Sequence, residues 1–310
     1  MRLINILLLL LLFSLASCEE NLTLDIPEGQ EQLVVEGHIE QGAPPVVVLT
    51  RSLPVFEGFS PADTEAGFVH GAQVVVSSGG RSYTLEEIPA AAFWSELRRV
   101  VSEQYGIPED QLTNGSGFIF YVYTSRELLG EVGKSYQLRI SHEGRVLSAS
   151  TTIPQLNPLD ALFLQPHPDP DQDSLFTLFY RYRDPDTLGN SVRYFTKRNS
   201  EPFYPGYFAS VFNDELINGV QALSYPLDRG EPRGQDPDLD TYSYFGKGDT
   251  VVVRWAALDL DHYRFWYTLE NERNNNGSPI GSPNTTRSNI QGGMGVWGGY
   301  GVTYHQIIIE

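Results

Sequence analysis

Short segments rich in β-branched and aromatic residues recur along most of this chain, and turn residues separate them. Leu33 to Ile39 and Pro45 to Thr50 are two such segments, and Ala72 to Val76 and Tyr83 to Leu85 are two more. Within each pair a short stretch containing glycine separates the two segments, which is typical of a β-hairpin. The pattern restricts the fold to a mainly β class, built from short strands and tight turns.

Residues 31–155 are predicted to form an Ig-like or transthyretin-like β-sandwich. Three further strands are expected there, at the regular spacing of such a sandwich: Phe118 to Thr124, Tyr136 to Ile140 and Val146 to Thr152. Residues 90–112 break this spacing, because Phe93, Leu97 and Val100 recur at helical intervals. We therefore expect a helical insertion between two strands of the sandwich.

Residues 156–310 are predicted to form a second β-rich domain that carries one helix near its C-terminal end. The strand pattern stops at Pro154 and Pro158, which suits a domain junction. Seven strands are expected beyond it: Leu159 to Leu164, Leu175 to Arg183, Val192 to Lys197, Tyr207 to Phe212, Val220 to Leu227, Val251 to Leu258 and Gly301 to Ile309. The fold class is therefore mainly β throughout.

The C-terminal helix is expected to run from His262 to about Arg273. Asp261 precedes it and is predicted to be its N-cap, because a carboxylate accepts the free N–H groups of a first helical turn. Trp266 and Leu269 would share the packed side of this helix.

The chain begins with a leader that ends at its only cysteine. Arg2, the apolar run from Leu7 to Phe13 and the small residues before Cys18 form a secretory pattern too short to span a membrane. Residues 1–17 are interpreted as a lipoprotein signal peptide, and acyl chains on Cys18 would anchor the protein stably. Residues 18–30, acidic and polar, would be the lipidated tether. A secretory signal with an incidental cysteine is the alternative.

The mature chain would be strongly acidic. The sequence has a formal charge of −18, and loss of Arg2 with the leader, which contains no acidic residue, makes it −19. A protein that binds nucleic acid needs a basic face to neutralise phosphates, and no run of lysine and arginine is present. Nucleic acid is therefore not expected as a partner. The single cysteine also excludes an intrachain disulfide, so core burial must supply the stability.

Motifs that would identify an enzyme are missing from the sequence. The six histidines form no metal-binding pair, and Gly-x-Ser-x-Gly does not occur. Gly130 to Ser135 fails the spacing of a phosphate-binding loop and is interpreted as a hairpin turn. Gly293 to Gly298 is interpreted as a glycine-rich loop, whose glycines permit close backbone approach around Trp297 and Tyr300. No catalytic or cofactor-binding residue is assigned.

Three alternating carboxylates are weak candidates for a calcium site. Asp169, Asp171 and Asp173 offer the hard oxygen ligands that calcium prefers. A calcium loop of the EF-hand type would want glycine and glutamate where this chain has Ser174 and Tyr180. A plain acidic turn is the alternative, and no metal is assigned.

Several of these segments together resemble a known family. Ser288 to Tyr300, Tyr263 to Trp266, and Leu33 to Gly37 shortly after a lipobox are similar to the Bacteroidota lipoproteins catalogued as domain of unknown function 4249. The resemblance covers nearly the whole mature chain. It implies an outer-membrane lipoprotein, often encoded beside TonB-dependent receptors, with no established activity. In that group, acidic residues such as Glu19 and Glu20 after the cysteine are associated with display on the cell surface rather than the periplasmic face.

We therefore expect a non-enzymatic outer-membrane lipoprotein that is accessory to a TonB-dependent receptor in nutrient capture or uptake, with no cofactor. One alternative is a stand-alone glycan- or peptide-binding surface module, because the aromatic faces of Phe203 to Phe208 and Tyr242 to Phe245 would stack on sugar rings. Another is a hydrolase whose carboxylates come from dispersed positions.

Overall fold

The computed structural model describes residues 31–310 except 53–64, 216–218, 220–222, 233–236 and 276–285. The signal peptide, Cys18 and the tether were predicted within residues 1–30 and lie outside the described residues. Residues 31–310 form a single unit of contacts. In the part of the chain that the structure describes, no helix is long and apolar enough to cross a membrane.

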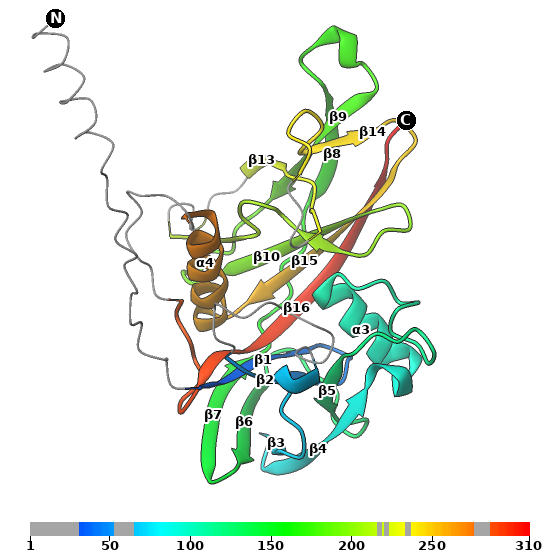
Figure 1. Ribbon diagram of the computed structural model, residues 1–310. Helices are drawn as coiled ribbons and strands as arrows, with labels where there is room; N and C mark the ends of the chain where they lie inside the picture. The colour runs from blue at the N-terminus through cyan, green and yellow to red at the C-terminus, as the bar shows by residue number, and fades with distance from the viewer. Residues whose placement is uncertain (1–30, 53–64, 216–218, 220–222, 233–236, 276–285) are drawn as a thin grey trace, which may run out of the picture. The chain divides into compact units, whose positions relative to one another are not determined.

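The predicted mainly β fold is confirmed, and its described strands form two sheets (Figure 1). The larger has twelve strands: β1 (Leu33–Glu40), β2 (Val46–Arg51), β3 (Gln73–Ser78), β4 (Arg81–Pro89), β5 (Tyr121–Thr124), β6 (Ser135–His142), β7 (Arg145–Thr152), β10 (Ser191–Arg198), β11 (Tyr204–Pro205), β12 (Val211–Asn213), β15 (Thr250–Leu258) and β16 (Met294–Ile308). The smaller has four: β8 (Ala161–Pro166), β9 (Leu175–Tyr182), β13 (Leu223–Leu227) and β14 (Tyr244–Gly246).

The β-sandwich predicted for the N-terminal part is also confirmed. The order of strands in the larger sheet is β11-β10-β15-β16-β1-β2-β5-β4-β3-β6-β7, with β12 also paired to β10. Buried side chains of β1, β2 and β16 pack with those of β3, β6 and β7 in one core. The predicted hairpins β1–β2 and β3–β4 are antiparallel neighbours, and so are β6 and β7.

The glycine-rich segment before the last strand is not a loop, as was predicted, but the first half of β16. This half pairs in parallel with β1, from Val34 opposite Met294 to Glu40 opposite Tyr300. Glycine is needed for that pairing. A Cβ on Gly295, whose φ is +107°, would lie 1.9 Å from the carbonyl oxygen of Val35. The predicted close backbone approach is therefore confirmed. The strand itself was not predicted, because glycines weaken a strand pattern.

Strand β16 joins the two halves of the chain. On one side it pairs with β1, and on the other it pairs antiparallel with β15. Strands from both sides of residue 155 therefore share one sheet. The division into two domains at that residue stays a prediction, and no sequence pattern indicated a strand shared in this way.

The predicted helical insertion is confirmed as α3 (Ser95–Tyr105), which follows the 3-10 turn η1 (Ala90–Ala92). Leu97 and Val100 are buried, and they pack in one cluster with Val48 of β2. The helix ends at Gly106, whose positive φ of +67° suits a left-handed C-cap. The apolar spacing in residues 90–112 thus reflects packing against the sheet.

The C-terminal helix α4 (Leu260–Asn275) is confirmed, but two details of its prediction are wrong. Asp259, not Asp261, caps it, because the Asp259 Oδ1 accepts the N–H of His262 at 2.9 Å. Leu269 is 37% exposed. The buried side instead includes Trp266 and the polar side chains of His262 and Glu270, so apolar spacing alone misplaced the packed face.

Gly130 to Ser135 forms a turn, but the hairpin predicted there is wrong. The segment connects β5 to β6, and these strands are not neighbours, since β5 pairs with β2 and β4 whereas β6 pairs with β3 and β7. Gly133 has a φ of +78°, and a Cβ on Gly130 would lie 2.1 Å from the carbonyl oxygen of Glu40. The glycines are therefore required by the backbone conformation of this turn and by its close approach to Glu40.

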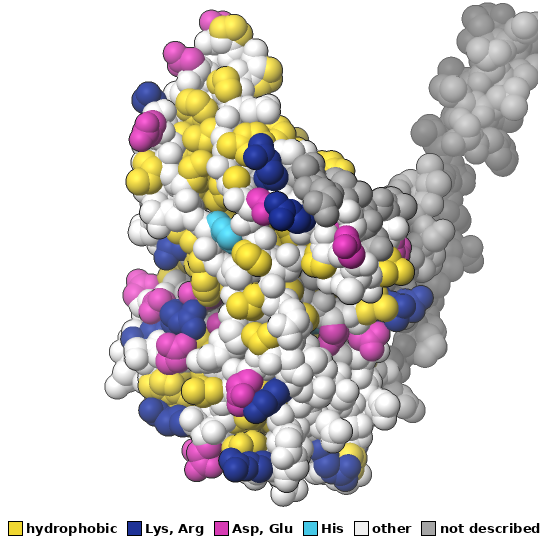
Figure 2. Space-filling model, turned by 180° about the vertical axis from the view of Figure 1, so that it is seen from behind, with side chains coloured by type: hydrophobic (Ala, Val, Ile, Leu, Met, Phe, Trp, Pro, Cys, Tyr) yellow, Lys and Arg dark blue, Asp and Glu magenta, His cyan; other side chains and the backbone are white. Residues whose placement is uncertain are grey.

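The smaller sheet presents aromatic side chains on one of its faces. Figure 2 shows hydrophobic side chains gathered over the part of the molecule that carries this sheet. Phe163 of β8 and Phe179 of β9 stack with ring centroids 5.5 Å apart, and the Arg181 guanidinium lies 5.8 Å from the Phe163 ring. The buried residues of β9 pack in a core that also contains Trp255 of β15.

Candidate ligand pocket

A pocket of about 380 Å³ lies where the connector after β7 passes the ends of β9, β10 and β15. Its lining comes from these three strand ends, the connector and the loop between β9 and β10: Pro154, Gln155, Leu156, Asn157, Tyr182, Pro185, Thr187, Gly189, Asn190, Ser191, Val192, Ala257 and Leu258. The volume lies near the lower end of the range of about 300–1,000 Å³ that is usual for small-molecule sites. The pocket is therefore sized for one small ligand.

One wall of the pocket is the end of the β10–β15 ladder. Ser191 lies opposite Leu258 in this antiparallel pair, and Val192 lies opposite Ala257. Ser191 is only 2% exposed. Its hydroxyl has no hydrogen-bond partner in the structure. A buried hydroxyl without a partner costs about 1–3 kcal/mol, so this group opposes folding locally.

A buried carboxylate holds the β9–β10 loop in place. Asp214 is 1% exposed. It accepts the backbone N–H of Gly189 at 2.9 Å, the backbone N–H of Asn190 at 2.9 Å and the side-chain amide of Asn190 at 3.1 Å. Several N–H donors offset the loss of hydration that burial of a charge causes. Asp214 thus fixes the loop that forms the second wall.

A second buried carboxyl supports Tyr182, which lines the pocket. The Asp184 side chain is 2% exposed and accepts the N–H of Gly219 at 3.0 Å. Burial raises the pKa of Asp184 above its ordinary value. Burial also raises the pKa of Tyr182, and the nearby Asp184 charge adds to this, so the phenol stays neutral. The amide of Asn157 donates to the Tyr182 hydroxyl at 2.5 Å.

The chemistry of the pocket is polar but uncharged. Its polar lining consists of hydroxyl and amide groups, and its apolar lining includes Leu156, Val192 and Leu258. No Asp, Glu, Lys, Arg or His is among the described lining residues. Such a lining can hydrogen-bond and pack against a ligand, but it supplies no general base and no charge to stabilise a transition state. The described lining can therefore hold a ligand through hydrogen bonds and apolar contacts.

The sequence reasoning missed this pocket. The prolines at 154 and 158 marked its connector as a junction, which is a common place for ligand sites. No motif, however, connects Asn157 with Ser191 or with Leu258. These residues meet only because β10 and β15 pair and the connector crosses their ends.

The two aromatic segments singled out in the sequence are brought together. Phe208 contacts Tyr207 and Tyr242 edge to face, with ring centroids 5.0 and 5.3 Å apart. Phe208 is 47% exposed, whereas Phe203 and Phe245 are buried in the protein. Only some of the aromatic side chains that were predicted to stack on a ligand are therefore exposed enough to do so.

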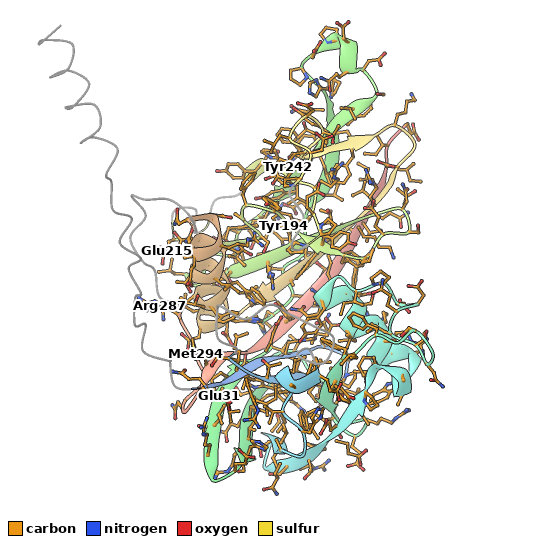
Figure 3. All side chains as sticks on the ribbon, viewed as in Figure 1. Glu31, Tyr194, Glu215, Tyr242, Arg287 and Met294 are labelled. Carbon is orange, nitrogen blue, oxygen red and sulfur yellow. The ribbon has the colours of Figure 1, made fainter. Side chains whose placement is uncertain are left out.

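Polar contacts anchor this aromatic cluster, which is defined as Tyr207, Phe208 and Tyr242. The Tyr242 hydroxyl donates to Asp228 Oδ2 at 3.1 Å. Tyr194, drawn close to Tyr242 in Figure 3, donates its hydroxyl to the carbonyl of Ala209 at 3.2 Å. These contacts hold the loop after Phe208 against the protein.

The weak calcium candidates lie around the 3-10 turn η2 (Pro170–Gln172). The Asp169 side chain caps this turn and accepts the N–H of Asp171 at 3.0 Å. None of the residues of η2 is buried. Within the described ranges, which include Asp173, no group of three or more His, Cys, Asp or Glu residues is placed to hold a metal ion. The carboxylate of Asp169 therefore stabilises the turn η2.

Carboxylates from distant positions do meet in the protein, but arginines hold them. Arg254 of β15 is 1% exposed and binds Glu40 of β1 at 2.6 Å. Glu103 of α3 binds Arg99 at 2.8 Å and accepts from the Tyr304 hydroxyl at 2.6 Å. A hydrolase of the dispersed type needs two carboxyl groups facing a substrate. Here the carboxylates are paired with arginines instead, Glu40 with Arg254 and Glu103 with Arg99.

Two buried histidines flank Tyr300 beside this ion-pair cluster. The ring centroids of His262 and His38 lie 4.5 and 6.0 Å from that of Tyr300. Burial lowers the pKa of His262 to about 3, and the charge of Arg193 adds to the effect. Burial, helped by Arg254, also lowers the pKa of His38 well below its ordinary value. Both rings are therefore neutral near pH 7.

Comparison with known proteins assigns the chain to a family whose function is not described. The family model described as domain of unknown function, DUF4249, matches residues 19–306. The chain therefore belongs to that family, and the resemblance seen in the sequence is confirmed. No curated protein matches the chain.

Proposed function

We propose that this member of the DUF4249 family is a non-enzymatic outer-membrane lipoprotein that acts beside a TonB-dependent receptor in nutrient capture or uptake. The observation that carries the proposal is the position of the family match, which begins at residue 19, directly after Cys18. The first strand begins at Leu33. The family domain would thus hang from the lipid by a short acidic segment, and Glu19 and Glu20 favour display on the cell surface.

The ligand pocket supports a role in capture. Its described lining residues offer hydroxyl and amide groups and include no charged side chain. A protein that delivers a nutrient unchanged needs a site that binds and releases its ligand, and it needs no catalytic group. Two buried carboxylates hold residues of its walls: Asp214 accepts the N–H of Asn190 at 2.9 Å, and Asp184 accepts from the Tyr182 hydroxyl at 3.5 Å.

The proposal is tested by affinity purification from solubilised outer membranes. A tagged full-length protein should recover a TonB-dependent receptor, and a tagged unrelated lipoprotein of the same membrane serves as control. Repeated purifications that recover no such receptor would overturn the partner. Protease treatment of intact cells tests the surface assignment, since a surface-displayed protein is degraded without lysis.

The aromatic cluster supports a second candidate function, a stand-alone glycan- or peptide-binding module. Phe208 is exposed beside Tyr207 and Tyr242, and aromatic faces stack on sugar rings and on peptide side chains. Phe208→Ala should abolish binding on a glycan or peptide array. Tyr225→Ala is the matched control, because Tyr225 is equally exposed, at 47%, and is not part of the cluster. Arrays without any signal would dispose of this candidate.

A further inference from the structure

Strand β8 forms one edge of the smaller sheet. Among the described residues, β9 is the only strand that pairs with it. The N–H of His167, directly after β8, donates to the carbonyl of Leu175 at 2.8 Å. Hydrogen-bonding groups alternate along an antiparallel strand, so those of Phe163 also face β9, whereas those of Leu162 and Leu164 face outward. None of the residues of β8 is buried. Its outer edge is therefore a template for another strand.

The sequence of β8 does not protect this edge. Proteins usually keep a free strand edge from pairing with charged residues or with a proline inside the strand. β8 contains no charged residue, and its one proline, Pro166, stands at the last position. On the opposite side of the same sheet, β13 carries Pro226 in its interior, where the missing N–H interrupts the edge. The β8 edge is thus a neutral strip, where two copies of a chain with a formal charge of −18 can meet without repulsion between like charges.

The edge is complementary to itself about Phe163. When two copies of β8 run antiparallel about a two-fold axis at this residue, Leu162 of one copy lies opposite Leu164 of the other, and each such pair exchanges both backbone hydrogen bonds. Phe163 then faces its counterpart on the aromatic face of the sheet, where it already stacks on Phe179 with ring centroids 5.5 Å apart. This pairing satisfies the outward groups of both strands and joins the phenylalanine rings of the two copies in one row.

Charges at the two ends of β8 favour the same antiparallel pairing. Beyond its last residue the chain carries three exposed carboxylates around η2: Asp169, Asp171 and Asp173. Beside its first residue lie the exposed side chains of Arg181, opposite Ala161, and of Arg183. An antiparallel pair brings the end of one β8 next to the start of the other. The acidic turn of each copy therefore lies at the same end as the arginines of the second copy, and this holds at both ends.

We propose that two copies of this protein associate through their β8 edges, as an antiparallel pair centred on Phe163 that joins their smaller sheets into one. The outward backbone groups call for a strand, and the neutral edge with opposite charges at its ends identifies that strand as a second β8. This inference goes beyond the proposed function, because it concerns contact between copies rather than contact with a receptor.

Association is tested by sedimentation velocity of the purified full-length lipoprotein in a density-matched detergent. Wild type should sediment as a dimer. Phe163→Lys should raise the dissociation constant of the dimer about tenfold or more, because two lysines would face each other across the axis in place of two phenylalanines. Phe179→Lys is the matched control, since it alters the same face of the sheet one strand away from the axis, and it should remain dimeric. Circular dichroism checks that both variants fold. A monomeric wild type, or equal dissociation of the two folded variants, would overturn the proposal.

The register is tested with Phe163→Cys in membranes of cells that produce the full-length protein. The axis makes Phe163 and its counterpart a non-hydrogen-bonded pair, whose Cα atoms lie about 4.5 Å apart and suit a disulfide. Mild oxidation should therefore give a covalent dimer on a non-reducing gel. Gln165→Cys is the control, because this residue and its counterpart would lie roughly 13 Å apart along the strands. Wild type, whose only cysteine is Cys18, is the second control.

Each result of the cross-linking decides the proposal. A covalent dimer that forms with Phe163→Cys, and with neither control, supports the antiparallel pair of β8 edges. Absence of a dimer, or equal cross-linking of Phe163→Cys and Gln165→Cys, would overturn the register. A disulfide between Phe163→Cys and a different protein would assign the β8 edge to that protein and overturn the second copy.

Discussion

The indole Nε1 of Trp297 donates a hydrogen bond to the backbone carbonyl of Tyr136 at 3.1 Å. Trp297 lies in β16 and is 0% exposed, in the centre of the sandwich core. Tyr136 belongs to β6, in the N-terminal half of the chain. The C-terminal strand therefore supplies the largest side chain in the core of the N-terminal sandwich.

This relationship predicts that residues 19–155 do not fold alone. Without β16 the sandwich loses Trp297, and β1 loses the parallel partner that pairs with it from Val34 to Glu40. Loss of a buried tryptophan alone costs about 3–5 kcal/mol, a large share of the stability of a small domain. The fragment should show no cooperative thermal transition by circular dichroism, while the full chain should. A cooperative, well-dispersed fragment would instead support an independent N-terminal domain.

Gly298→Ala should destabilise the protein through a contact with α4. A Cβ at this position would lie 2.0 Å from Nδ1 of His262, a residue that is itself buried. Overpacking of this kind costs about 1–3 kcal/mol or more. Gly246→Ala is the control, because its nearest non-neighbouring atom, on Asp249, lies at an ordinary 3.5 Å. Urea denaturation of both variants should show a lower midpoint only for Gly298→Ala.

Glu40→Gln should also destabilise the protein, by about 3–5 kcal/mol, because it leaves the buried Arg254 without its closest anion. The exposed pair of Glu131 and Lys134 provides the comparison, with Lys134 Nζ 2.8 Å from Glu131 Oε2. Glu131→Gln should leave the urea midpoint almost unchanged, since water screens an exposed pair. Equal losses in the two variants, measured by urea denaturation, would show that Arg254 finds another partner.

The strands were largely predictable from the sequence because their signal is local. Val251 to Leu258, for example, was predicted within one residue of β15. The first half of β16 was not, because Gly295 and Gly298 weaken a strand pattern, and the contacts that require them, with Val35 and His262, lie far away in the sequence.

The sites depended even more on contacts between distant residues. The aromatic segments were recognised by composition, but only the fold shows that Phe208 is exposed while Phe245 is buried. Ser191 carries no signal at all in the sequence, since only the fold shows that its hydroxyl is buried without a hydrogen-bond partner. The sequence indicated Asp261 as the cap of α4, but the helix begins at Leu260, so Asp259 is the residue that caps it.

Cys18→Ala should release the protein from the membrane. If Cys18 is the lipidation site, the variant has no thiol to accept a diacylglycerol, and its single cysteine leaves no substitute. Fractionation followed by immunoblotting should find wild type in the outer-membrane fraction and the variant in the soluble fraction. Ser17→Ala, which keeps a small residue before the cysteine, is the control and should remain anchored. A variant at Cys18 that stays in the membrane fraction would refute the anchor.

The stability of the protein should fall as the pH drops below about 6.5, and His262 should be one cause. Its pKa is about 3 in the folded protein, against an ordinary value of 6.5. Between these values the unfolded chain binds a proton at this histidine and the folded protein does not. The stability from a neutral His262 is therefore fully present above pH 6.5 and is lost as the pH falls towards 3, at up to about 1.4 kcal/mol per pH unit.

His262→Gln isolates this contribution, because glutamine keeps a polar side chain and does not titrate. The free energy of unfolding, measured in urea between pH 5 and 6.5, should fall less steeply with decreasing pH in the variant than in wild type. Some slope should remain, because burial also lowers the pKa of His38. Above pH 8 both histidines are almost fully deprotonated in the folded and unfolded states, so the two proteins should show the same slope there. An identical slope between pH 5 and 6.5 would mean that His262 becomes protonated inside the fold, beside Tyr300 and despite the charge of Arg193.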